Sequence, residues 1–156
     1  MKTNHLSELI NGSIELELNM ATLYGIFAEQ IEQDREFWWK LQQEEKSHAV
    51  LIRAARDSFV KRDKFPSDLV AGSIEDLKKS NARVTQLISK FKKDTLTRCE
   101  ACRLAVELEQ EAGEIHYTKF MGKEAETTVE SAFQQLNRED KDHAERIRQH
   151  CSAIEC

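Results

Sequence analysis

Hydrophobic side chains recur along this chain in alternating steps of four and three residues, which is the spacing of one face of an α-helix. Four such stripes predict helices at about residues 5–32, 35–60, 98–121 and 127–152. The turns inside the first pair and inside the second pair are short, so each pair is expected to form an antiparallel hairpin. The pattern therefore predicts an all-α fold, an antiparallel four-helix bundle of two helical hairpins in one domain.

The connection between the two hairpins, residues 61–96, has a different character. It contains the only proline of the chain, Pro66, and its hydrophobic pattern is weak. Residues 74–93 fit one or two short helices. A connection of this length can run along a whole bundle, so we expect a crossover rather than a second domain.

Helix starts are marked by capping residues. Thr97 and Glu100 have the spacing of a capping box at the start of the third helix, and Thr127 and Glu130 repeat it at the start of the fourth. Asp34 is placed to cap the second helix. These signals support the boundaries that the hydrophobic stripes predict.

Composition narrows the classes of protein to which the chain can belong. Its 156 residues are 33% charged and 40% hydrophobic, with a formal net charge of −5. An acidic chain does not match nucleic acid, whose binders present a basic face, and no apolar run has the length of a membrane span. The first residues lack the apolar core of a signal peptide, so we expect a cytoplasmic protein. In that compartment four cysteines are expected to be reduced thiols, metal ligands or redox groups rather than structural disulfides.

Six polar side chains interrupt the hydrophobic stripes at positions that face the predicted core. They are Glu17, Glu45, His48, Glu109, Asp140 and His143. Burying unpaired carboxylates is costly, and the stripes carry no lysine or arginine to compensate them. Divalent transition metals would satisfy all six side chains together, because carboxylates can bridge two ions and a histidine nitrogen can bind each ion.

The same arrangement occurs in both halves of the chain. Each hairpin has one acid on its first helix, and an acid followed three residues later by histidine on its second. The segments EEKSHA (44–49) and EDKDHA (139–144) match at four of six positions. A single Glu-x-x-His pair is common on solvated helices, so it is the duplication that predicts a metal site.

With the segment ELNMATLY (17–24), these motifs resemble the ferritin-like di-iron carboxylate superfamily over nearly the whole chain. The most similar subgroup is the rubrerythrin-related single-domain proteins that lack a rubredoxin domain. The resemblance implies two iron ions, with manganese or zinc as alternatives. It also assigns the ligands: Glu17 and Glu109 as terminal ligands, Glu45 and Asp140 as bridges, and His48 and His143 as nitrogen ligands.

Several positions depart from the family pattern. Asp140 stands where the family has glutamate, and its carboxylate is one methylene shorter. Ala112 stands where rubrerythrin carries an extra glutamate, which puts its ligand-switching peroxidase chemistry in doubt. His116 lies two turns beyond Glu109, too far to be a direct ligand. No rubredoxin-like cysteine motif follows the fourth helix, so electrons are expected from an external donor such as a rubredoxin-like protein.

The resemblance implies a di-iron oxidoreductase that reacts with oxygen or hydrogen peroxide, of peroxidase or ferroxidase type, in oxidative-stress defence or iron handling. It also implies a homodimer. The alternative is a non-catalytic bundle that binds or senses metal or redox state, which the shorter Asp140 favours. A purely structural interaction bundle is a third class, and it predicts no metal and tolerance of Glu45→Ala.

Tyr24 and the four cysteines allow two interpretations each. Tyr24 either packs in the core or donates a hydrogen bond to a ligand carboxylate. The cysteines, Cys99, Cys102, Cys151 and Cys156, lie at the start of the third predicted helix and at the end of the fourth. Helical rise places Cys102 and Cys151 at similar heights on the metal-facing stripe. They are either small buried thiols or a redox pair or thiolate metal site that serves the centre.

Overall fold

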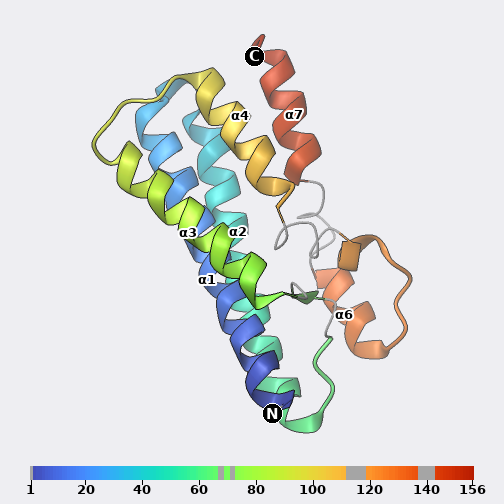
Figure 1. The fold of residues 1–156 in the computed structure, drawn as a ribbon. Helices are drawn as coiled ribbons and strands as arrows, with labels where there is room; N and C mark the ends of the chain where they lie inside the picture. Colours follow the sequence, from blue (N-terminus) through green and yellow to red (C-terminus); the bar gives the residue numbers. More distant parts are fainter. Residues whose placement is uncertain (1, 67–68, 71–72, 112–118, 137–142) are drawn as a thin grey trace.

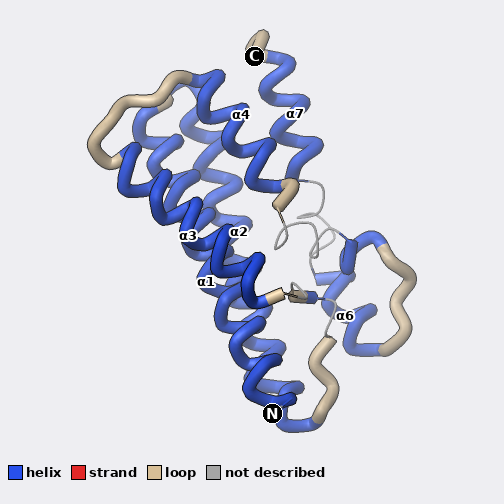
Figure 2. Tube along the Cα trace, in the orientation of Figure 1, coloured by secondary structure: helices blue, strands red, loops and turns tan. Residues whose placement is uncertain are grey.

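The computed structural model describes residues 2–66, 69–70, 73–111, 119–136 and 143–156, and within these ranges regular structure is helical with no β-strand (Figure 2). The prediction of an all-α protein is therefore confirmed for the described residues. None of the described helices combines the length and hydrophobicity needed to cross a membrane. The finer prediction, a ferritin-like four-helix topology, stays a prediction.

Helices α1 (Lys2–Gln30) and α2 (Arg35–Phe59) form a long antiparallel pair (Figure 1). A single 3₁₀ turn, Glu32–Asp34, joins them, as the short predicted connection requires. Their facing stripes supply most of the large buried side chains of the core, among them Ile10, Leu23, Tyr24, Phe27, Trp38, Leu41 and Ile52. After α2 a second 3₁₀ turn, Val60–Arg62, ends the hairpin.

Helix α3 (Ile74–Phe91) is one helix of 18 residues, where the weak pattern was compatible with one or two short ones. Ser73 caps it by accepting a hydrogen bond from the Asp76 N–H. The helix packs along α1, and at Gly12 an added Cβ would lie 3.3 Å from the Leu77 side chain. Glycine at this position therefore allows the two helices to approach.

Helices α4 (Arg98–Glu109) and α7 (His143–Ala153) lie side by side (Figure 1). The predicted capping box of Thr97 and Glu100 is confirmed in both of its hydrogen bonds. The predicted helix 98–121 is interrupted, since α4 ends at Glu109, where the Gln110 N–H bonds to the carbonyls of Glu107 and Leu108, and residues 119–122 are again helical. Gly113, a weak helix former, follows soon after in the sequence.

The fourth predicted helix, 127–152, corresponds to two described helices, α6 (Thr128–Leu136) and α7. Figure 1 shows α6 apart from the α4–α7 pair. At its start the Thr127 hydroxyl accepts from the Glu130 N–H at 3.1 Å, as a capping box predicts. The Glu130 carboxylate, however, accepts from the Glu126 N–H at 2.8 Å, one residue earlier than the predicted partner.

Asp34 connects three parts of the fold. It occupies the predicted N-cap position of α2 but makes no capping hydrogen bond. Arg98 instead donates two hydrogen bonds to its carboxylate, at 2.8 and 2.7 Å, which lowers the pKa of Asp34. The His150 ring lies 3.3 Å from the same carboxylate and stacks on Phe37, with 3.8 Å between ring centroids. The start of α4 and the end of α7 are thus fastened to the turn between α1 and α2.

The four cysteines form two disulfide bonds, Cys99–Cys156 and Cys102–Cys151, with Cα–Cα distances of 5.2 and 5.8 Å. This corrects the expectation of reduced thiols, which rested on the assumed compartment. No cysteine of the described chain is left as a free thiolate for a second metal site. The inner bond does join the two cysteines that helical rise placed at similar heights.

Candidate metal centre

Five of the six predicted ligands are brought together in the interior. Glu17 comes from α1, Glu45 and His48 from α2, Glu109 is the last residue of α4, and His143 is the first of α7. Their exposed fractions are between 0% and 5%. Glu45 and His48 share one face of α2 because they are three residues apart. The sixth predicted ligand, Asp140, lies outside the described residues, as do His116 and Ala112.

Glu45 lies between the two histidines. Its Oε1 is 3.0 Å from His143 Nδ1, and its Oε2 is 3.1 Å from His48 Nδ1. The two imidazole rings are nearly parallel, with 5.0 Å between their centroids. One carboxylate therefore faces two nitrogen ligands through separate oxygens, which is the position that a bridging ligand needs.

Each histidine also faces a second glutamate. His48 Nδ1 is 3.4 Å from Glu17 Oε2, and His143 Nδ1 is 3.7 Å from Glu109 Oε1. The centre is thus made of two similar groups, Glu17 with His48 and Glu109 with His143, that share Glu45. The duplication seen in the sequence reappears as two adjacent ligand groups.

These side chains fit divalent transition metals. Two ligand atoms that are each about 2.1 Å from one ion lie about 3.0 Å apart at a right angle and about 3.4 Å apart at a tetrahedral angle. The contacts of Glu45 with the two histidines and of Glu17 with His48 fall within 0.1 Å of these values, at 3.0, 3.1 and 3.4 Å. Ligand atoms of Glu45, His48 and His143 all lie within 4.8 Å of one another. This buried group can therefore hold a metal ion.

Without metal, the charges of the centre are balanced by protons. Burial and the nearby Glu45 charge raise the pKa of Glu17 to about 8. Burial would lower the pKa of His48, but hydrogen bonds to Glu17 and Glu45 raise it to about 10. Burial would likewise lower the pKa of His143, yet its carboxylate neighbours, Glu45 first, raise it well above its usual value.

Glu45 is negatively charged in the metal-free centre. Burial alone would raise its pKa, but the charges and hydrogen bonds of His143 and His48 hold the pKa of Glu45 well below its usual range. At neutral pH the metal-free centre therefore contains an ionised Glu45 between two imidazolium rings. A divalent ion that binds to the histidine nitrogens or to Glu17 must therefore displace the protons that these groups carry.

Tyr24 contacts the centre directly through its hydroxyl. The hydroxyl donates a hydrogen bond to Glu109 Oε1 at 2.5 Å, and the side chain is fully buried. The ring stacks on Trp38, with 5.7 Å between centroids at 30°. Tyr24 thus combines core packing with a hydrogen bond to Glu109, and the role of Glu109 as a metal ligand stays a prediction.

Two residues beside the centre, Glu44 and Arg146, are not among those that the sequence pattern predicted. Glu44 is only 9% exposed. Its Oε2 is 2.9 Å from His143 Nε2, and Arg146 donates to both of its oxygens at 2.9 and 3.0 Å. Burial would raise the pKa of Glu44, but hydrogen bonds from His143 and Arg146 hold it below its ordinary value. Glu44 therefore orients His143 from the side opposite Glu45.

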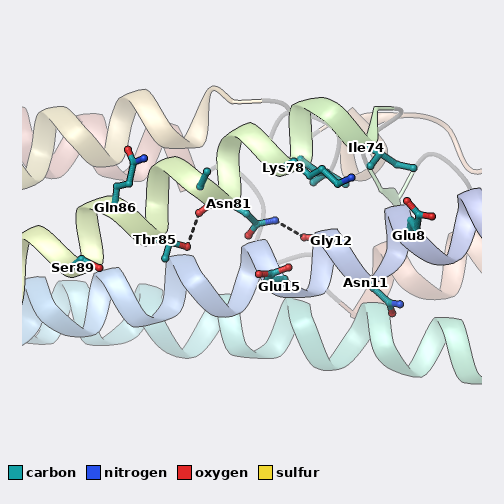
Figure 3. A pocket seen from close by; sticks show the side chains of 12 residues that line it. Glu8, Asn11, Gly12, Glu15, Ile74, Lys78, Asn81, Thr85, Gln86 and Ser89 are labelled. Carbon is teal, nitrogen blue, oxygen red and sulfur yellow. Dashed lines mark hydrogen bonds between the residues drawn. The ribbon is translucent and has the colours of Figure 1, made fainter.

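Surface grooves lie elsewhere on the molecule. One groove of about 700 Å³ runs between α1 and α3 (Figure 3). Its buried polar residue, Asn81, is fully engaged, since it donates to the Gly12 carbonyl at 3.0 Å and accepts from the Asn19 amide at 2.9 Å. None of the five described ligands lines this groove. The centre is thus enclosed among helices rather than placed in this groove.

Comparisons with protein families, curated proteins and solved structures give no match to this chain.

Proposed function

We propose that the chain binds two divalent transition-metal ions, in the first place iron, and reacts with oxygen or hydrogen peroxide. The observation that carries the proposal is the position of Glu45, whose two oxygens face two different histidines at 3.0 and 3.1 Å. Glu17 and His48 would hold one ion, Glu109 and His143 the other, and Glu45 would bridge them. Asp140 is the proposed second bridge.

Iron at such a site supplies the electrons that reduce oxygen or peroxide, and an external electron donor would restore them. The protein's own residues prepare the site for this chemistry. The Glu44 carboxylate lies 2.9 Å from His143 Nε2, and this ion pair favours the ring orientation that turns Nδ1 toward the other candidate ligands. Tyr24 donates to Glu109 Oε1, the oxygen that also faces His143 Nδ1, and so fixes the orientation of this carboxylate. Burial of all five ligands excludes bulk water from the centre.

A second candidate function is a non-catalytic metal-binding or sensing bundle. The enclosure of the ligands favours it, because none of the five described ligands lines the grooves along α1 and α3 or along α4 and α7. Oxygen and peroxide are small, whereas a larger substrate would need an opening. The two candidates share the same metal ligands and differ in their reaction with oxidants.

Elemental analysis of anaerobically prepared protein, followed by Fe(II) titration under oxygen, tests both candidates. Two irons per chain that oxidise rapidly would support the oxidoreductase. Two ions that stay inert to oxygen and peroxide would support the metal-binding or sensing bundle. One ion or none per chain would contradict the two-ion centre.

A pair of matched variants tests the role of Glu45. Glu45→Gln removes the shared carboxylate charge, and we expect it to reduce binding to at most one ion per chain. Glu36→Gln makes the same change at an exposed position of α2 and should bind two ions. Equal metal content in both variants would rule out Glu45 as the bridge.

A further inference from the structure

The two disulfides form a ladder between the start of α4 and the end of α7. Cys99 and Cys102 lie three residues apart in the first turns of α4, and their partners Cys156 and Cys151 lie five apart at the C-terminal end. On a helix, residues three apart have Cα atoms about 5 Å apart. That separation is within the range that a disulfide spans. Cys99 is therefore placed to bond either to Cys156 or to Cys102.

Accessibility differs sharply between the two bonds. Cys99 and Cys156 are exposed, whereas Cys102 and Cys151 are 3% and 8% exposed. An exposed disulfide is open to attack by a thiolate, and an inner one is not. Reduction is thus expected to begin at Cys99–Cys156 and to reach Cys102–Cys151 only through a neighbouring thiol.

A groove lies over the ladder. It has a volume of about 650 Å³ and is lined by all four cysteines together with residues of α4 and α7, among them Arg103, Val106, Glu107 and Arg148. A space of this size admits a small dithiol or the cysteine-bearing loop of another protein. The positive end of the α4 dipole, next to Cys99, stabilises a thiolate there.

Stabilisation of the folded chain explains one of the two bonds better than it explains both. Cys102–Cys151 closes a loop of 49 residues. Once it is formed, Cys99–Cys156 closes only the two residues between Cys99 and Cys102 and the four between Cys151 and Cys156. Loop-closure entropy depends on loop length, so the outer bond constrains the unfolded chain much less. An exposed bond that adds little further constraint, beside a buried one, has the arrangement of an exchange site.

We propose that this ladder is a thiol–disulfide exchange site that accepts an electron pair from a dithiol. One donor thiolate attacks the Cys156 sulfur, the Cys99–Cys156 bond breaks, and Cys99 leaves as a thiolate. The second donor thiol attacks the mixed disulfide, so the donor becomes a disulfide and Cys156 leaves as a thiolate.

The electron pair is then transferred to the inner disulfide, Cys102–Cys151, without a further reagent. The Cys99 thiolate attacks the Cys102 sulfur, a Cys99–Cys102 bond forms, and Cys151 leaves as a thiolate. The two protons of the donor dithiol end on Cys151 and Cys156. The product has one disulfide inside α4 and two thiols on the C-terminal segment, and a second dithiol can reduce the remaining bond.

The exchange site is separate from the metal centre. Cys102 precedes Glu109 by seven residues of α4, which is about 10 Å along the helix axis. No step of the exchange uses a metal ligand, so the proposal does not depend on the proposed function. Glu45→Gln should leave the exchange unchanged.

The test uses the folded, oxidised protein and one molar equivalent of dithiothreitol. Acid quenching, alkylation and peptide mapping by mass spectrometry then locate the new thiols and the remaining disulfide. We expect label on Cys151 and Cys156 and a Cys99–Cys102 bond. Label on Cys99 and Cys156 with Cys102–Cys151 intact would overturn the inward transfer, and resistance of both bonds in folded protein would overturn the exchange site altogether.

Two serine variants keep the test decisive. In Cys156→Ser the thiol of Cys99 is free, and we expect the mapped disulfide to be Cys99–Cys102 with Cys151 alkylated. In Cys99→Ser, the matched control, Cys102–Cys151 should stay intact and Cys156 should carry the label. Circular dichroism establishes that both variants are folded. The same disulfide, Cys102–Cys151, in both variants would contradict the proposal.

Discussion

Tyr24→Phe tests the two-group description of the metal centre most directly. The substitution removes only the hydroxyl that donates to Glu109 Oε1 at 2.5 Å. The ring can stay in place, because it packs against Trp38 and Phe27 at centroid distances of 5.7 and 6.0 Å. The change therefore acts on the orientation of one ligand and not on the core.

The expected effect follows from the hydrogen bond and from its burial. A hydrogen bond to a charged group contributes about 1.5–3 kcal/mol. If the whole bond supports the ligand geometry, the loss weakens binding by roughly 10- to 150-fold, since each 1.4 kcal/mol is about tenfold. Because Tyr24 donates to Glu109, we expect the loss at the ion held by Glu109 and His143.

Anaerobic calorimetry with Co(II), which stands in for Fe(II), measures the two binding steps separately. One dissociation constant should rise in Tyr24→Phe while the other stays within a factor of about two, which is under 0.5 kcal/mol. Thr22→Val removes an exposed hydroxyl from the same helix and should change neither constant. If both constants rise equally, or neither changes, the division into two ligand groups is refuted.

Three further predictions concern the charges and the disulfides. In protein from which a chelator has removed metal, the temperature at the midpoint of unfolding should fall as the pH rises from 6.5 to 9.5. Glu17 and His48 hold protons in the folded chain up to pKa values of about 8 and 10, whereas the unfolded chain releases these protons near pH 4.5 and 6.5. A midpoint temperature that does not change with pH, measured by scanning calorimetry, would contradict this. Glu44→Ala should weaken one Co(II) site by roughly 10- to 100-fold in the same titration, and an unchanged site would deny Glu44 its orienting role. Replacing all four cysteines by alanine should lower the free energy of unfolding, measured in urea, by about 4 kcal/mol, because it opens a loop of 49 residues. Replacing only Cys102 and Cys151 should lower it much less, because the outer bond closes nearly the same loop. Equal losses in the two variants would contradict this.

The helical stripes predicted the centre because its ligands lie where hydrophobic neighbours lie. Glu17, Glu45 and Glu109 follow the four-and-three spacing, and that spacing survives in α1, α2 and α4. Periodicity does not report where a helix ends, so the end of α4 at Glu109 was missed. This end depends on local propensity and tertiary packing, which a stripe does not record.

Glu44 was missed for a related reason. Glu44 precedes Glu45, so its side chain points about 100° away from that of Glu45 around the axis of α2. If α2 is considered alone, this face of the helix would be exposed to solvent. Arg146 and His143 from α7 cover that face and bury it. A helical stripe describes one helix at a time, whereas burial of Glu44 depends on a partner helix about one hundred residues later in the chain. For the cysteines, the position was predicted and the oxidation state was not. Helical rise placed Cys102 beside Cys151, whereas the argument from the assumed compartment predicted reduced thiols.

The attachment of α4 and α7 has a mechanical consequence. Both helices are held at one end, by Asp34 and by the two disulfides, and both carry a candidate metal ligand, Glu109 or His143, nearer the other end. Rotation of either helix about its fixed end therefore displaces the candidate ligand near the opposite end. Over the 12 residues of α4, about 18 Å, a tilt of only about 3° moves the Glu109 end by about 1 Å. Metal affinity should thus respond to small changes in helix angle, and the fixed base keeps that angle constant.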